Sequence, residues 1–263
     1  MTGKYLRLWS KTFALELSSE MAYKTNFIIK SLALMLADFV GPLIIILIYS
    51  SSSGIPGWSF EEFILFHGTF IFVTGLSHAF LIILPLQVIE NVREGTFDKI
   101  LVKPFNPLLY LTFSSIDLEG FAEVFAGLVL IIWAFVKLNI IVFSLNTLLY
   151  LFMILTAFVL LYSLMVLISS FAFLFVKSFG LFDLLFKLLD VGRYPMSIYG
   201  FEMRFIFTFI LPIAVVSFYP ASALLGTLNL VSLIEILIPI IIFLVFSILM
   251  WNIAIKKYTS AGG

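Results

Sequence analysis

The chain has 263 residues, of which 62% are hydrophobic and only 11% are charged. Because a soluble domain averages about 25% charged residues, this composition excludes a soluble fold and indicates that lipid is the solvent. The 15 basic and 15 acidic residues cancel, so the net charge says nothing about nucleic acid or acidic ligands, and only the distribution of charge is informative. We expect a lipid bilayer around the chain and no nucleic-acid partner. The chain has no cysteine, which excludes disulfides, thiolate metal sites and cysteine nucleophiles.

Residues 1–25 predict a helix that lies on the membrane surface. Apolar residues recur at helical spacing on one face, and these are Leu6, Trp9, Phe13 and Leu17. Three cations fall on the opposite face, and these are Lys4, Arg7 and Lys11. The pattern is typical of an interfacial elbow helix whose cations face anionic headgroups. Such a helix either sets only the angle at which the first span begins or also contacts a cytoplasmic partner.

Six later stretches are long and apolar enough to cross a bilayer, which requires about 20 residues. They cover roughly residues 26–50, 62–85, 118–137, 147–176, 202–219 and 229–254. We therefore expect an all-α integral membrane protein with one transmembrane domain over 26–254 and a cytoplasmic tail over 255–263. The stretch 178–191 is also apolar, but Asp183, Lys187 and Asp190 favour a surface or re-entrant helix there.

The basic residues orient this six-span arrangement. Of the 15 Lys and Arg residues, 14 fall on one side, and Lys137 is the exception. They lie in the N-terminal segment, at Lys30 where the first span starts, in the tail, and in the connections after the second and fourth spans. The last of these holds Lys177, Lys187, Arg193 and, at its end, Arg204. The positive-inside rule predicts that this side is cytoplasmic and that both termini lie there.

The connection between the second and third spans carries the most informative segment, Glu94–Leu101. The helical pattern of the second span continues beyond the length of the hydrocarbon core, although Pro85 is expected to kink it. This extension holds the segment clear of the bilayer. Gly95 permits a sharp turn, and Pro104 ends the helix expected after that turn.

Within this segment we expect a short amphipathic helix. Thr96 is expected to cap it, and Asp98 in its first turn opposes the helix dipole. Phe97, Ile100 and Leu101 share an apolar face, and no other segment is an obvious cover for it. That face either rests on lipid headgroups or docks in the groove of a partner. The flanking Lys99 would help to set the register of such a complex.

Four motifs, in this order and spacing, carry a resemblance to a known family. The first is E-G-T-F-D-x-I-L-x-x-P from Glu94 to Pro104. The others are Arg193-Tyr194-Pro195-x-Ser197-Ile198-Tyr199, Phe218-Tyr219-Pro220-Ala221 and Tyr258-Thr259-Ser260-Ala261-Gly262. Together with the span pattern, the chain resembles the permease subunit of a type-2 ABC transporter, in the branch of six-span bacterial permeases called ABC-2 family transporter proteins.

The resemblance implies a function and partners. In such transporters the segment matching Glu94–Leu101 is a coupling helix, which docks on a separate ATP-binding subunit that holds ATP and Mg. Two permeases, identical or related, would form the pathway in the bacterial inner membrane, and two ATPase subunits would drive it. The resemblance favours export by alternating access.

The chain itself carries no pattern for nucleotide hydrolysis. A P-loop requires G-x-x-x-x-G-K-[ST], and the sole Gly-Lys pair is Gly3-Lys4, with no room upstream for the first glycine. We therefore expect this chain not to be an enzyme, to bind no cofactor and to have no catalytic residues. ATP hydrolysis is expected in the partner subunit.

Several polar residues fall within the predicted spans and could line a pathway. His67 and His78 lie in the second span about 16 Å apart, too far to share a metal ion, so each either links helices or contacts substrate. Asp38 lies near the middle of the first span, where an ionisable group is costly. It is either a buried partner for another helix or part of a cavity wall. Glu119 and Glu123 lie one turn apart and favour a polar cytoplasmic entrance.

A second class of function stays open at this point. A secondary transporter or channel would need no ATPase and would use intramembrane charges as an ion pathway. Asp38 and Glu235 are the residues that favour this class.

Overall fold

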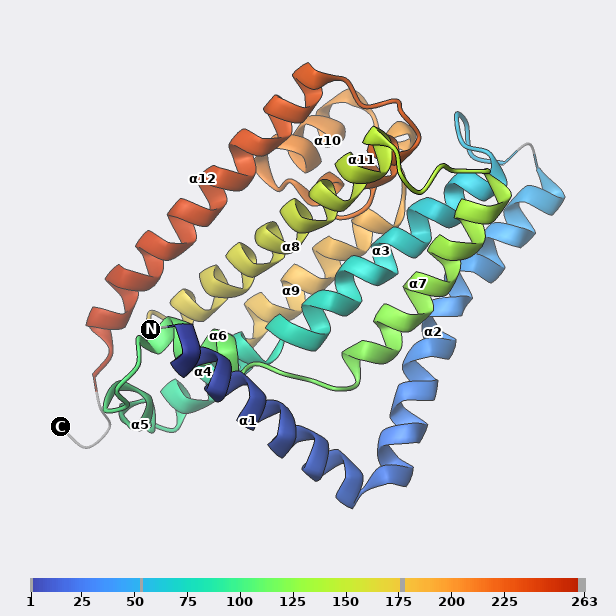
Figure 1. The fold of residues 1–263 in the computed structure, drawn as a ribbon. Coiled ribbons are helices and arrows are strands. Elements are labelled where there is room, and N and C mark those ends of the chain that lie inside the picture. The colour runs from blue at the N-terminus through green and yellow to red at the C-terminus, as the bar shows by residue number, and fades with distance from the viewer. Residues whose placement is uncertain (1, 53, 176–177, 260–263) are drawn as a thin grey trace.

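The computed structural model describes residues 2–52, 54–175 and 178–259, and every regular element in these ranges is helical (Figure 1). Among them, five helices are long and apolar enough to cross a membrane. They are α2 (Lys24–Ser51), the pair α3 (Phe60–Leu81) and α4 (Ile83–Arg93), α7 (Gly120–Lys137), α8 (Leu145–Ala172) and α12 (Leu230–Ala254). The predicted all-α membrane class is confirmed. Lys177 and Ser260–Gly262 lie outside the described residues.

Helix α1 (Thr2–Ala22) crosses one end of the bundle and meets α2 at a sharp corner (Figure 1). Its first turn packs on the connection after α4, where the ring of Tyr5 lies 5.5 Å from that of Phe105 and Lys4 donates a hydrogen bond to the carbonyl of Pro104. On the face predicted to meet lipid, Leu6 and Leu17 stay exposed. The helix therefore uses one face against the protein and leaves the other free.

The helix after the first connection bends where Pro85 predicts, and a capping box marks its start. At its start, the Ser59 hydroxyl accepts a hydrogen bond from the Glu62 backbone N–H, and the Glu62 carboxylate accepts one from the Ser59 N–H. Three residues before Pro85 the regular pattern breaks at Ile82, whose N–H bonds to the carbonyl of Ser77. A proline ring clashes with the preceding turn and removes one donor, which explains the break between α3 and α4.

Helices α3 and α7 pack closely because glycines lie on both contact faces. A Cβ atom added at Gly127 would lie 2.4 Å from the backbone nitrogen of Phe72, and one at Gly75 would lie 2.7 Å from that of Val124. Small residues let membrane helices approach until their backbones touch, which increases van der Waals contact between them. The α3–α7 pair therefore forms a tight unit, and the polar residues near its end are held by it.

The predicted span 202–219 is not a single helix. It contains α10 (Phe201–Phe205), a π-helical turn (Ile206–Ile210) and a 3₁₀ turn (Ile213–Val215), and then runs into α11 (Phe218–Leu224). The break falls at Leu211, whose φ of −125° and ψ of 85° lie outside the helical region. Pro212 comes next, and a proline disfavours the helical conformation of the residue before it.

Residues 178–198, and not the predicted span 202–219, connect the two ends of the bundle in this part of the chain. Helix α9 (Phe179–Leu189) and two 3₁₀ turns (Asp190–Arg193 and Met196–Ile198) come after α8. Ser178 donates to the carbonyl of Phe175 just beyond α8, whereas the Ser197 hydroxyl accepts a bond of 3.2 Å from Trp58 at the other end of the bundle. Residues 178–198 thus run through the bundle, where we had expected a surface or re-entrant helix and assigned the crossing to 202–219.

The two described ends of the chain lie at the same end of the bundle. The connection after α4 contains α5 (Asp98–Leu101) and α6 (Pro107–Ser114). Tyr5 contacts this connection near α1, and the ring of Tyr258 lies 5.4 Å from that of Phe97. We call this the α5 end and the opposite one the Trp58 end. Because both described ends lie at one end, the chain between them makes an even number of passages through the bundle.

Candidate functional site

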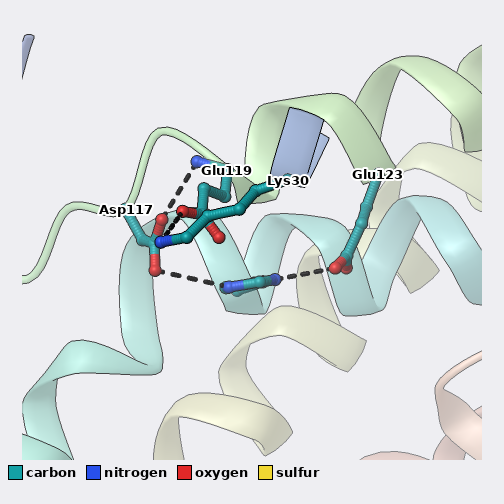
Figure 2. Close-up of polar contacts among 5 residues, drawn as sticks. Lys30, Asp117, Glu119 and Glu123 are labelled. Carbon is teal, nitrogen blue, oxygen red and sulfur yellow. Dashed lines mark hydrogen bonds and ion pairs between the residues drawn. The ribbon is translucent and has the colours of Figure 1, made fainter. Parts of the chain in front are cut away.

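A cluster of charged residues ties α2, α3 and α7 together toward the α5 end. The imidazole Nδ1 of His78 lies 2.7 Å from Glu123 Oε1, and its Nε2 lies 3.4 Å from Asp117 Oδ2. Lys30 Nζ on α2 lies 2.8 Å from Glu119 Oε1 (Figure 2). Burial by itself would raise the pKa of Asp117, but the hydrogen bond and charge of His78, the backbone N–H of Glu119 and the charge of Lys30 together outweigh it, so the pKa of that carboxyl is lowered.

These contacts give definite partners to most of the predicted pathway residues. His78 and Glu123, both named from the sequence, contact each other, and Glu119 pairs with Lys30. Lys30 is therefore not paired with Asp38, which lies eight residues further along α2, about 12 Å away at 1.5 Å per residue. The role of this cluster as an entrance stays a prediction.

Next to the cluster lies a cavity of about 330 Å³ between α2, α3, α7, α8 and α9. Five residues of its lining can carry charge, and these are Asp38, His78, Glu123, Asp190 and Arg193. The remaining lining is mostly apolar, with Leu34, Leu161 and Leu189 among its members. Asp38 thus lies in a cavity wall, which was one of the two roles expected for it.

Two of these charged residues come from the segment that sequence reasoning placed at the membrane surface. Arg193 Nε lies 2.9 Å from Asp190 Oδ1, and the guanidinium lies 5.4 Å from the centre of the Phe70 ring in α3. Arg193 also lines a second cavity of about 150 Å³ toward the Trp58 end. Asp183, Lys187 and the adjoining Asp190 fall on one face of α9 and are exposed, so their spacing indicates a polar face but not that this helix runs along the bundle.

His67 lies apart from the cluster. It is buried against Gly41 of α2, where an added Cβ would lie 2.1 Å from its Nε2 atom. It also lines the smaller cavity. Within the described part of the chain, no group of three or more His, Asp or Glu residues is placed to hold a metal ion.

The loop Glu94–Leu101 differs from its prediction in one decisive respect. Phe97 is 0% exposed and Ile100 is 6% exposed, so most of the expected apolar face is covered by the chain itself. The Phe97 ring lies 4.9 Å from that of Phe173 after α8 and 5.4 Å from that of Tyr258 in the tail. Periodicity within the loop could not reveal this cover, because both partners are distant in sequence.

The predicted cap of the loop helix was also wrong. The Thr96 hydroxyl donates to the side-chain oxygen of Asn91, 2.9 Å away, and α5 begins only at Asp98. Gly95 has a φ of +66°, which is the left-handed conformation that a turn at this place requires of glycine. The hydrogen bond of Thr96 fastens this turn to the end of α4.

The surface that remains at the tip of the loop is small and well defined. Val102 is 82% exposed and Leu101 is 40% exposed, and the charged Glu94 and Lys99 are exposed beside them. We call Glu94, Lys99, Leu101 and Val102 the loop tip. Val102 lies just beyond the segment singled out from the sequence.

Comparison with known proteins gives one match. The family model described as ABC-2 family transporter protein matches residues 32–262. The searches among curated proteins and among solved structures found no match. Because the family match covers most of the chain, and because the chain has several apolar helices that can cross a bilayer, it belongs to the ABC-2 transporter family as a membrane permease component.

Proposed function

We propose that this chain is the permease subunit of a bacterial ABC exporter, driven by separate ATP-binding subunits that dock on the loop tip. The observation that carries the proposal is an exposed apolar tip on a loop whose base is packed into the bundle, in a chain of the ABC-2 family. Membership of this family favours the ATP-driven class over a secondary transporter or channel. ATP and Mg would be held by the partner.

The proposed topology has six passages, with residues 178–198 as the fifth. It is supported by the two chain ends, which lie together at the α5 end. Lys4, Arg7, Lys99 and Lys256 also belong to this end, which by the positive-inside rule is cytoplasmic. Arg193 and Arg204 no longer contribute to this bias, because they lie toward the Trp58 end. The membrane is then the bacterial inner membrane.

The anchoring of the loop supports a coupling role for Glu94–Leu101. A partner that binds Leu101 and Val102 would pull on α5, and Phe97 would transmit that displacement to the end of α8 and to the tail. The charges of Glu94 and Lys99 would set the register of the complex. In this arrangement Phe97 and Ile100 anchor the loop in the bundle, and the loop tip is the surface that the ATPase contacts.

The pathway is proposed to lie beside α2, α3 and α9, with a second permease, identical or related, completing it. Asp38, His78 and Glu123 line the cavity there, and ion pairs of Lys30 and His78 link α2, α3 and α7 at its α5 side. Alternating access requires that ATP bind more tightly to the closed state of the assembly, because a ligand shifts an equilibrium only through its differential affinity.

The loop tip can be tested with a pair of matched valines. Val102→Asp places a charge on the loop tip, whereas Val142→Asp places one on the connection between α7 and α8, where the side chain is 59% exposed. Tagged variants are purified from bacterial membranes, and the ATP-binding subunit and ATPase activity recovered with them are measured. We expect at least a tenfold loss for Val102→Asp and none for Val142→Asp, with equal membrane insertion. Equal recovery from both, or transport by the chain without an ATPase, would refute the proposal.

A further inference from the structure

The larger cavity contains one carboxylate that the described residues do not satisfy. Glu123 is paired with His78 at 2.7 Å, and Asp190 is paired with Arg193 at 2.9 Å. Asp38 Oδ2, in contrast, is buried and has no hydrogen-bond partner among the described residues. A buried polar atom without a partner costs free energy, and the cost is larger for a charge within a membrane.

The nearby cations are already engaged elsewhere. Lys30 Nζ lies 2.8 Å from Glu119, and the Arg193 guanidinium lies against both Asp190 and the Phe70 ring. The charged lining contains three carboxylates against one arginine and one histidine. The cavity therefore has an excess of acidic groups, and a positive ligand would balance it.

The walls indicate what kind of cation would fit. Apolar and aromatic side chains make up much of the lining, and these are Leu34, Ala37, Phe70, Leu161, Phe186 and Leu189. The cavity volume of about 330 Å³ is far larger than a bare metal ion and lies at the lower end of the range of pockets that bind small organic ligands, about 300–1,000 Å³. A bare ion such as Ca²⁺ would also require about six or more oxygen ligands, which such walls do not supply.

We infer that this cavity binds an organic cation, with Asp38 as its counter-ion and the apolar walls around its body. The inference rests on the proposed function, because it names the class of substrate that the permease would carry. A carboxylate at the end of an apolar pocket recognises an ammonium group by charge and selects the remainder of the molecule by shape.

The experiment uses the purified chain in phosphatidylcholine nanodiscs, without any ATPase, and radiolabelled phenyltrimethylammonium as the probe. Asp38→Asn removes the charge with little change of shape, and Asp38→Glu retains it. Glu235→Gln is the matched control, because Glu235 is exposed on α12 and does not line this cavity. We expect affinity to fall at least tenfold in Asp38→Asn, to stay within about threefold in Asp38→Glu and to be unchanged in Glu235→Gln.

A neutral compound of the same shape, tert-butylbenzene, separates charge recognition from simple apolar binding. We expect it not to displace the cation. Displacement by tert-butylbenzene as effective as by unlabelled cation, or unchanged cation affinity in Asp38→Asn, would overturn the inference. Val102→Asp should bind the cation normally, since the loop tip is not part of the cavity. Loss of the cation site and loss of ATPase docking are therefore observed separately.

Discussion

The replacement Phe97→Ala tests how the loop after α4 is held. The ring is fully buried between Phe173 and Tyr258. Truncation of a buried phenylalanine to alanine costs about 3–5 kcal/mol. At about 1.4 kcal/mol for each factor of ten, the loop should open between about 100-fold and a few thousand-fold more often. The loop would then detach from α8 and from the tail, while the transmembrane helices remain folded.

Hydrogen exchange measures this opening directly. The amides of Ile100 and Leu101 donate to the carbonyl of Phe97, so their exchange reports on the anchored turn. Val102→Ala is the control, because an exposed side chain rarely changes stability by more than about 0.5 kcal/mol. We expect a large loss of protection in Phe97→Ala and almost none in Val102→Ala. Similar protection in both variants would show that the ring contacts do not hold the loop.

Two further predictions concern the helices around the candidate site. Gly127→Ala should lower stability by about 1–3 kcal/mol, because the new methyl group would meet the backbone of Phe72. Thermal unfolding in detergent measures it against Gly180→Ala, where no atom lies within 4 Å, and equal melting temperatures would contradict it. Burial, with help from Asp117, raises the pKa of Glu16 in α1. Packing of α1 should therefore tighten as the pH falls from above this raised pKa toward the ordinary value of a glutamate. The measurement is the amide protection factors of α1, that is, exchange rates corrected for intrinsic exchange at each pH, and Glu16→Gln should remove their dependence on pH.

Much of the architecture derives from local chemistry. Hydropathy over windows of about 20 residues suffices to find α2, α7, α8 and α12, because a spanning helix must satisfy its own backbone within lipid. The start of α3 is set by Ser59 and Glu62, and the break before α4 is set by Pro85. Each of these features depends on residues close together in sequence.

The segment 178–198 shows where local chemistry misleads. The stretch 202–219 is the more apolar one, yet Pro212 breaks it, and it lies as short helices at the Trp58 end. The segment that does connect the two ends carries Asp183, Lys187 and Asp190. Charges on one face of α9 are compatible with passage through the bundle because Leu185 and Leu189 are buried on the other.

The candidate site was predicted in part. Asp38, His78 and Glu123 stand out because ionisable groups in an apolar span are rare. That they gather at one cavity, and that Asp190 and Arg193 join them, depends on the course of α9. His67, of the same residue type as His78, is instead packed against a glycine.

By itself, the sequence determined the solvent, most of the spanning helices and the place of the loop after α4, since these depend on composition and on the spacing of neighbouring residues. The tertiary structure decided which part of that loop is free. Phe97 and Ile100 have the helical spacing of a docking face, but the end of α8 and the tail cover Phe97. Contacts between segments far apart in the chain decide what remains exposed, and no local pattern contains them.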